Sequence, residues 1–144
     1  MTFEEADLER FVAAQNPVFD QVCAELAAGY KQSHWMWFIF PQLKSLGRSS
    51  TARHYGVADR AEAEAYWQHP LLRARLEQCT GLVLAIRGKT VNQIFGSPDD
   101  LKLRSCMTLF ESVAPDQAIF GDVLGRYYDG NRDQATLTAL KPAP

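Results

Sequence analysis

Hydrophobic residues recur at spacings of three and four along most of the chain, the period that places them on one side of an α-helix. One run predicts a central core helix over Leu71–Arg87 that ends at Gly88; its apolar positions are Leu72, Leu76, Cys79, Val83 and Ile86. A second run predicts a helix behind Ser97-Pro98-Asp99-Asp100, with Ser97 as its N-cap; its apolar positions are Leu103, Cys106, Met107, Phe110 and Val113.

Other start and stop signals predict the remaining helices. Asn16-Pro17 predicts the start of a helix that ends near Gly29, and Pro115 the start of one that ends at Gly130. Shorter helices are expected over 3–15, 51–55, 60–67 and, capped by Asp133, 133–140. We therefore expect a mostly α fold: a compact single-domain bundle, 1–144, of about six to eight helices with no substantial sheet and a frayed tail at 141–144.

One region does not follow the helical period. Between Ser33 and Ser50, the run from Trp35 to Phe40 is apolar on every side and Pro41 interrupts it. Such a run is compatible with a buried irregular turn or with a short strand.

Composition and charge narrow the classes of function. The chain has 144 residues, 47% of them hydrophobic and 22% charged, which is typical of one folded domain. Its net charge of −2 lacks the basic excess that binds duplex nucleic acid. Cys23, Cys79 and Cys106 show no zinc-ligand spacing, and we expect buried thiols in a reducing compartment, with no metal and no cofactor indicated. Acids near the start and the lack of a membrane-length apolar run predict a soluble cytoplasmic protein that does not bind a membrane.

Candidate chemistry concentrates in one interval. No aspartate or glutamate lies between Glu25 and Asp59, yet the interval contains Lys31, His34, Lys44, Arg48, Arg53 and His54, interleaved with Tyr30, Trp35, Trp37, Phe38, Phe40 and Tyr55. Stacking faces beside phosphate-pairing cations are what a nucleotide-like ligand requires. The alternative is that the aromatic residues form core and the cations form a solvated rim.

Three smaller features add candidate residues, each with a structural alternative. Gly47-Arg48-Ser49-Ser50 could hold an anion on free backbone N–H groups, or could be an ordinary N-cap beside a surface arginine. His34 could carry protons or could be a satisfied core histidine. The later helix has a polar stripe with Lys102 and Ser105 beside it, which is either its solvated side or a source of acid–base groups; the stripe is Asp100, Arg104, Thr108 and Glu111.

The chain contains a distinctive ten-residue string, Ser33-His34-Trp35-Met36-Trp37-Phe38-Ile39-Phe40-Pro41-Gln42. Four shorter motifs follow it: Gly47-Arg48-Ser49, His69-Pro70-Leu71, Asp99-Asp100-Leu101-Lys102 and Met107-Thr108-Leu109-Phe110. In these motifs the chain resembles the bacterial DUF1810 or Rv1873-like family. Cys106 stands where we associate a serine with the family. The resemblance implies a compact, mostly α-helical fold and supplies no activity. The pairing of an early aromatic motif with a late helix is also similar to the NADAR group of ADP-ribose-processing proteins, which implies that ADP-ribose derivatives are worth assaying.

Two hypotheses follow. The first is a site that binds, with or without processing, a phosphorylated aromatic small molecule such as a nucleotide or an ADP-ribose derivative. Its catalytic candidates are His34, Asp100 and Glu111, and its ligand-binding candidates are Trp35, Trp37, Gln42, Lys44, Arg48, Ser49, Arg53, Tyr55, Lys102 and Arg104. The second is a protein-interaction module or homodimer that uses the aromatic segment 34–42. The sequence leaves open whether the protein is an enzyme and whether it is a monomer or a homodimer.

Overall fold

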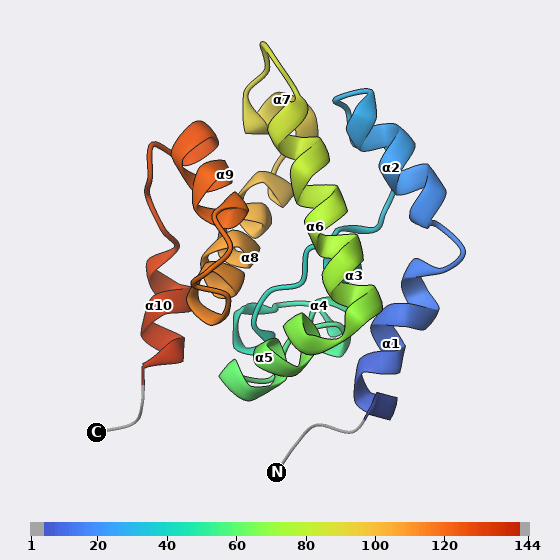
Figure 1. Ribbon diagram of the computed structural model, residues 1–144, viewed down its shortest axis with the longest axis vertical. Helices are drawn as coiled ribbons and strands as arrows, with labels where there is room; N and C mark the ends of the chain where they lie inside the picture. Colours follow the sequence, from blue (N-terminus) through green and yellow to red (C-terminus); the bar gives the residue numbers. More distant parts are fainter. Residues whose placement is uncertain (1–4, 142–144) are drawn as a thin grey trace.

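The computed structural model describes residues 5–141 and folds them almost entirely into helices (Figure 1). The helices are α1 (Glu5–Gln15), α2 (Phe19–Ala27), α3 (Met36–Ile39), α4 (Ser50–His54), α5 (Arg60–Gln68), α6 (Pro70–Ala85), α7 (Val91–Phe95), α8 (Asp99–Val113), α9 (Ile119–Tyr128) and α10 (Gln134–Leu140), with a 3₁₀-helix η1 (Lys44–Leu46). The mostly α class is confirmed, and the described chain has more helices than the six to eight expected. The tail at 142–144 and the first residues of the helix expected over 3–15 lie outside the described residues.

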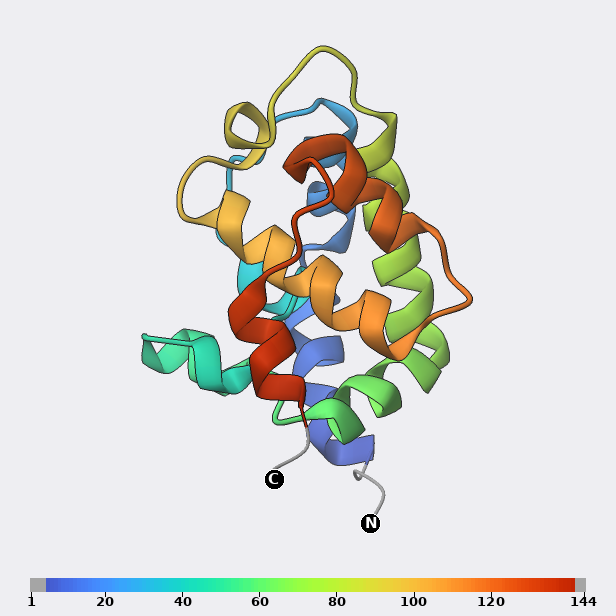
Figure 2. The same cartoon turned by 90° about the vertical axis from the view of Figure 1, so that its left-hand side faces the viewer.

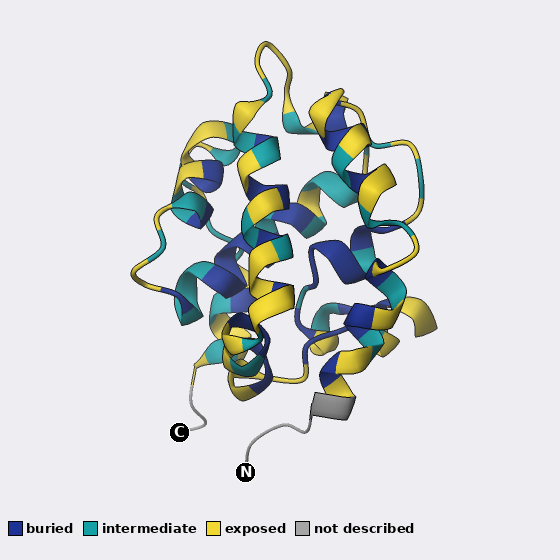
Figure 3. Ribbon diagram, turned by 45° about the vertical axis from the view of Figure 1, so that its right-hand side comes forward, coloured by how far each residue is buried: buried dark blue, intermediate teal, exposed yellow. Residues whose placement is uncertain are grey.

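The two longest helices organise the core. α6 packs against α2, α5 and α9, and α8 packs against α5, α7, α9 and α10 (Figures 1 and 2). Buried residues gather on the sides of the helices that face the interior (Figure 3). The apolar positions predicted for the centre of each helix are fully buried, including Leu76 and Val83 on α6 and Leu103 and Phe110 on α8. These side chains belong to one continuous hydrophobic cluster.

Pro70 opens α6 directly behind His69, as expected, but three other prolines do not mark helix starts as predicted. Residues 16–18 form a turn and α2 begins at Phe19, while the side chain of Asn16 accepts a 2.9 Å hydrogen bond from Arg75. α9 begins at Ile119, after a turn that contains Pro115. α8 begins at Asp99, and Ser97 does not cap it. Proline fixes only its own φ and removes one donor, so it suits a turn as well as the first turn of a helix.

Side-chain caps mark several other helix starts. His69 precedes α6 and its Nδ1 accepts a 3.3 Å hydrogen bond from Leu72 N. Asp133 caps α10 by accepting from Thr136 N at 3.1 Å, as predicted. Thr90 and Gln93 form a reciprocal capping box at α7, a helix that was not predicted from the sequence.

The all-apolar run after Ser33 forms the short helix α3, around a buried carboxylate. Glu25 of α2 is only 8% exposed and accepts five hydrogen bonds. The donors are Gln21 Nε2, Gln32 N, Ser33 N, Ser33 Oγ and Trp35 Nε1. These bonds tie the loop before α3 to α2, so the run needs no amphipathic pattern of its own.

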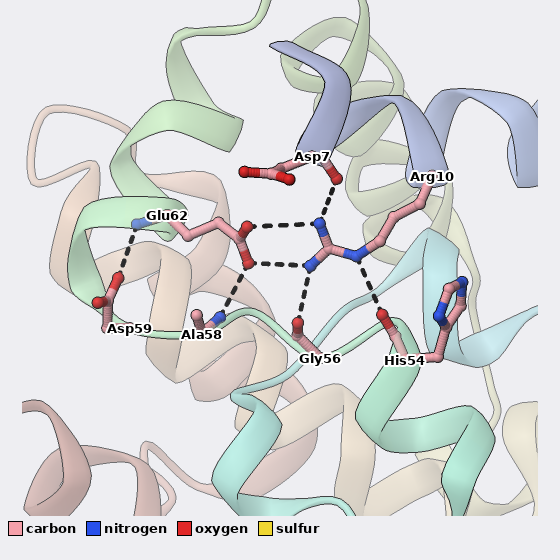
Figure 4. A network of polar contacts seen from close by, with 7 residues as sticks. All are labelled: Asp7, Arg10, His54, Gly56, Ala58, Asp59 and Glu62. Atoms are coloured by element: carbon pink, nitrogen blue, oxygen red, sulfur yellow. Dashed lines mark hydrogen bonds and ion pairs between the residues drawn. The ribbon is translucent and has the colours of Figure 1, made fainter. Parts of the chain in front are cut away.

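A second buried carboxylate fastens the N-terminal helix to the centre of the chain (Figure 4). Arg10 of α1 pairs with Glu62 of α5 at 2.9 Å, and its guanidinium also donates to the carbonyls of His54 and Gly56. Glu62 in turn accepts from Ala58 N at 2.9 Å. One arginine therefore joins α1 to the end of α4, to the loop that follows it and to α5.

A tight crossing fixes the segment before η1 against the segment after α4. Leu43 and Val57 form an isolated parallel bridge, the one β-type pairing within 5–141, with Lys44 N donating to Val57 O at 2.7 Å. A Cβ at Gly56 would lie 2.4 Å from the Lys44 Cα. Only glycine allows this approach, which positions the segment 42–52 next to α8 and α10.

None of the helices within 5–141 has the length and apolar character that crossing a membrane requires.

Candidate functional site

A groove of about 490 Å³ lies where the segment 42–52 meets the beginnings of α8 and α10. In Figure 2 these elements are the blue-green segment at the lower left, the orange α8 and the red α10. Its apolar lining is Leu46, Ala52, Pro98, Leu101 and Ala135. Its polar lining is Gln42, Arg48, Ser49, Lys102, Ser105 and Asp133. Four of the predicted ligand-binding residues therefore share one groove: Gln42, Arg48, Ser49 and Lys102.

The two cations of the groove come from different segments and differ in their partners. No hydrogen bond or ion pair joins the exposed Arg48 side chain to another described residue. Lys102 Nζ lies 3.7 Å from Asp99, a carboxylate that is paired more closely with Lys31, at 2.9 Å. Lys31 already neutralises Asp99. The charged residues of the lining are therefore Arg48 and Lys102 against Asp133, which leaves a net positive charge.

Ser49 and Gln42 provide neutral polar atoms. Ser49 Oγ accepts a 3.0 Å hydrogen bond from Ala52 N, which makes it the N-cap of α4. The N-cap interpretation of Gly47–Ser50 is thus confirmed for the serine, while Arg48 beside it lines the groove. The side-chain amide of Gln42 makes no hydrogen bond within the described chain, although its carbonyl oxygen on the backbone accepts from Val57 N.

Asp133 is the one acidic residue in the groove lining, and the sequence predicted only a structural role for it, as a helix cap. It lines the groove together with Ser105, whose Oγ donates to Asp133 Oδ2 at 3.1 Å. The sequence signal for Asp133 was its capping pattern. Nothing local to it indicated that α10 would fold back beside Arg48.

The two tryptophans of the motif have different environments. Trp35 is 1% exposed, with its indole nitrogen bonded to Glu25 at 2.9 Å, so it belongs to the core and does not reach the groove. Trp37 is half-buried, and Lys102 Nζ lies 5.3 Å from its ring centroid. The cation–π contact with Trp37 holds Lys102 next to the groove, while Trp37 itself does not line it.

The rest of the segment 34–42 is mostly interior. Its aromatic side chains Phe38 and Phe40 are buried, and only His34, Trp37 and Gln42 keep appreciable exposure. His34 is exposed in the loop before α3, away from the groove lining, so it is not the core histidine of the alternative interpretation. The segment therefore presents no continuous aromatic surface of the kind that the interaction hypothesis requires.

Three further candidates lie outside the groove. Tyr55 is half-buried and packs on Phe38, with ring centroids 5.3 Å apart. Arg53 is exposed, and its Nε donates to Gly47 O at 3.3 Å. Lys44 is exposed at the start of η1. None of the three lines the groove.

The polar stripe on α8 is covered by the segment that connects α9 to α10. Thr108 Oγ1 accepts from Asp133 N at 3.0 Å, and Glu111 binds Arg132 through both carboxylate oxygens, at 2.9 and 2.6 Å. Glu111 is therefore committed to an ion pair, and it lies outside the groove lining.

The beginning of the same stripe contacts Tyr128. The Tyr128 hydroxyl donates to the Asp100 backbone carbonyl, and the guanidinium of Arg104 lies 5.9 Å from the Tyr128 ring centroid. The Asp100 carboxylate accepts from Asn92 Nδ2 at 3.2 Å. Like Glu111, neither Asp100 nor Arg104 lines the groove, so the catalytic and ligand-binding candidates do not converge.

A larger hollow, of about 580 Å³, lies around the loop from Ile86 to Gln93. Two of its cationic side chains already donate hydrogen bonds to backbone carbonyls: Lys89 Nζ donates to Gly29 O at 2.9 Å, and Arg126 donates to Leu84 O near the end of α6. These contacts close the ends of helices, so this hollow offers an anion fewer free donors than its charge suggests.

The cysteines do not provide a nucleophile. All three are free thiols, Cys79 and Cys106 are buried, and Cys23 is partly exposed. Burial raises the pKa of all three thiols, most strongly those of Cys79 and Cys106. Each is therefore protonated at neutral pH, and a thiol attacks far more slowly than a thiolate.

Comparison with known proteins places the chain in a family. A crystal structure described as the conserved hypothetical protein Rv1873 from Mycobacterium tuberculosis is similar to it, with a TM-score of 0.93 and 50% sequence identity over 95% of this chain and 98% of that one. No curated protein matches the sequence. The family model described as a protein of unknown function, DUF1810, matches residues 5–140. The chain therefore belongs to the DUF1810 family.

Proposed function

We propose that this protein binds a small phosphorylated molecule with a flat, apolar body, of the nucleotide class, in the groove between the segment 42–52 and α8. The observation that supports this most is the convergence of Arg48 and Lys102. They come from separate segments and line one groove beside the apolar side chains of Leu46 and Leu101.

The charge of the groove favours a phosphate. Arginine presents a planar fork of donors that matches two phosphate oxygens, and lysine adds a compact point charge. Both side chains only donate, so their natural partner is an acceptor-rich anion. The volume of about 490 Å³ lies within the range of roughly 300–1,000 Å³ typical of small-molecule sites.

The apolar lining favours a ligand with a ring system rather than a free phosphate. Leu101 is 52% exposed and is one of three exposed large hydrophobic residues in the described chain, with Tyr30 and Leu71. Leu46, Ala52 and Ala135 extend this surface. The aliphatic contacts take the stacking role that the sequence hypothesis gave to Trp35 or Trp37, and Gln42 supplies an amide that can orient the ring.

Binding, rather than a reaction, is the activity proposed. His34, Asp100 and Glu111 are the sequence candidates for proton transfer, and none of them lines the groove. A general acid or base has to lie within hydrogen-bond reach of the atom that it serves. We also propose a bacterial cytoplasmic setting, which the three unlinked thiols support.

The experiment is a thermal-shift panel, followed by calorimetry, with adenosine, AMP, ADP, ADP-ribose and inorganic phosphate. A ligand at a hundred times its Kd stabilises the fold by about 2.7 kcal/mol. We expect AMP or ADP to raise the Tm of the wild type, and adenosine to have little effect. The double variant Arg48→Ala/Lys102→Ala should lose the shift.

Arg87→Ala is the matched control, because Arg87 is an exposed arginine that lines the other hollow. It should retain the full shift. The proposal is contradicted if no phosphorylated compound changes the Tm at millimolar concentration, or if the shift survives in the double variant.

A further inference from the structure

The carboxylate of Asp133 is used on one side only. Its Oδ2 accepts from Ser105 Oγ and Thr136 N, both at 3.1 Å, and from Thr136 Oγ1. Its Oδ1 accepts no hydrogen bond within the described chain. Oδ1 is not sealed in the interior, since Arg104 Nε is the one buried side-chain nitrogen or oxygen without a partner among the residues that the structure describes.

This asymmetry holds the free oxygen in place. The Asp133 backbone N–H donates to Thr108 Oγ1 at 3.0 Å, which anchors the residue on α8. Rotation of the carboxylate would break the three hydrogen bonds on Oδ2. Asp133 lines the groove, so its carboxylate lies at the groove wall, and Oδ1 is the oxygen of that carboxylate left without a protein donor.

A fixed acceptor in this position does not suit a bare phosphate. A carboxylate can only accept hydrogen bonds, and a phosphate dianion is also an acceptor, so the two repel each other. A ligand that satisfies both parts of the lining has an anionic group for Arg48 and Lys102 and a separate hydroxyl for Asp133. Within the nucleotide class, the ribose is the part that carries such hydroxyls.

We propose that Asp133 Oδ1 accepts a hydrogen bond from a ribose hydroxyl of the bound ligand, and that this contact makes the groove selective for ribonucleotides. The inference rests on the proposed function, since it identifies the sugar of the same ligand. Sites that hydrogen-bond a substrate hydroxyl reject the analogue that lacks it, because their polar atom is then left without a partner.

The test compares AMP with 2′,3′-dideoxy-AMP by calorimetry, on the wild type and on Asp133→Ser. Serine is also a favoured N-cap, so the start of α10 is retained, but it has no atom where Oδ1 stands. We expect the wild type to bind AMP about tenfold more tightly than the dideoxy compound, because the dideoxy compound cannot donate to the charged Asp133 carboxylate. Asp133→Ser should bind both compounds alike.

A second variant separates the loss of the hydrogen-bond acceptor from a loss of folding. Asp133→Asn keeps the cap and the shape of the side chain but replaces one carboxylate oxygen with an amide nitrogen; it should lose most of the preference while its unliganded Tm stays close to that of the wild type. Equal binding of the two compounds by the wild type would overturn the inference and leave the anion site standing. Full preference in both variants would also overturn it. Failure of AMP to bind at all would overturn the inference together with the proposed function.

Discussion

The indole nitrogen of Trp35 donates a 2.9 Å hydrogen bond to the buried carboxylate of Glu25. This bond explains why the most distinctive string of the sequence is structural. Trp35 is turned inward and its one polar atom is satisfied there, so the ring is not available to stack on a ligand. The candidate site lies instead beside the end of that string, where Gln42 and Arg48 reach α8 and α10.

Glu25→Gln should lower the free energy of unfolding by about 2–3 kcal/mol, because a neutral amide places its NH₂ group against donors that now face a carboxylate oxygen. Urea denaturation measures the change. Glu64→Gln is the matched control, since Glu64 is exposed on α5 and makes no side-chain hydrogen bond within the described residues. A cost for Glu25→Gln no larger than that of the control would contradict the role assigned to this carboxylate.

The same residue predicts a dependence of stability on pH. Burial alone would raise the pKa of Glu25, but the hydrogen bonds from Ser33, Gln32, Trp35 and Gln21 outweigh it and lower the pKa to about 2, from an ordinary 4.5. Since the folded pKa lies below the unfolded one, the stabilisation is complete above the unfolded pKa and is lost as the pH falls through the folded pKa. The stability difference between wild type and Glu25→Gln should therefore shrink between about pH 5 and pH 2. A difference that stays constant over that window would show that Glu25 is not held ionised.

Arg10→Ala should cost about 2–3 kcal/mol of stability, because it leaves the buried Glu62 carboxylate without its cation. The side chains of Arg10 and Glu62 are 20% and 4% exposed, respectively. The substitution Glu62→Gln should lower the free energy of unfolding less in the Arg10→Ala background than in the wild type. A double-mutant cycle measures this difference. Arg73→Ala breaks a half-exposed pair with Glu77 and should cost less than about 1 kcal/mol. Additive effects of the Arg10 and Glu62 changes would mean that the network of Figure 4 does not couple them.

Gly56→Ala should destabilise the fold by more than about 2 kcal/mol, since its Cβ would meet the Lys44 backbone and force the crossing apart. Gly81→Ala is the contrasting change. Gly81 lies inside α6 with nothing within 4 Å of its Cβ position, so alanine should raise stability by up to about 1 kcal/mol. Thermal denaturation of the two variants should give shifts of opposite sign. Equal shifts in the Tm of the two variants would contradict the close approach of Gly56 to the Lys44 backbone.

Periodicity predicted the parts of the fold that depend on one-sided burial. The buried positions of α6 and α8 could be predicted because apolar residues on one side of each helix alternate with polar residues on the other. The run from Trp35 to Phe40 has no such contrast, since α3 is buried nearly all round and is tied down by Glu25, a residue of another helix. α7 could have been found from Thr90 and Gln93, which have the capping-box spacing.

The candidate site was predictable in part. An interval without acids pointed to Arg48, and the helix expected after Ser97 pointed to Lys102, because charge is visible in sequence. Which cations have partners is not visible: Lys31 is neutralised by Asp99, and Glu111 by Arg132. Asp133 enters the groove only because α10 folds back along α8, a long-range contact that no local pattern encodes.

The most direct test of the groove is a ¹⁵N–¹H NMR titration of the wild-type protein with AMP. Amide shifts should be largest within the segments 42–52, 99–105 and 133–135, and they should saturate with one Kd. Without AMP, the Arg48→Ala/Lys102→Ala variant should keep the dispersed spectrum of the folded protein, with changes confined to the neighbourhood of the two substitutions, and it should respond little to AMP. Saturable shifts centred elsewhere, such as around residues 86–93, or none in these three segments, would contradict the site.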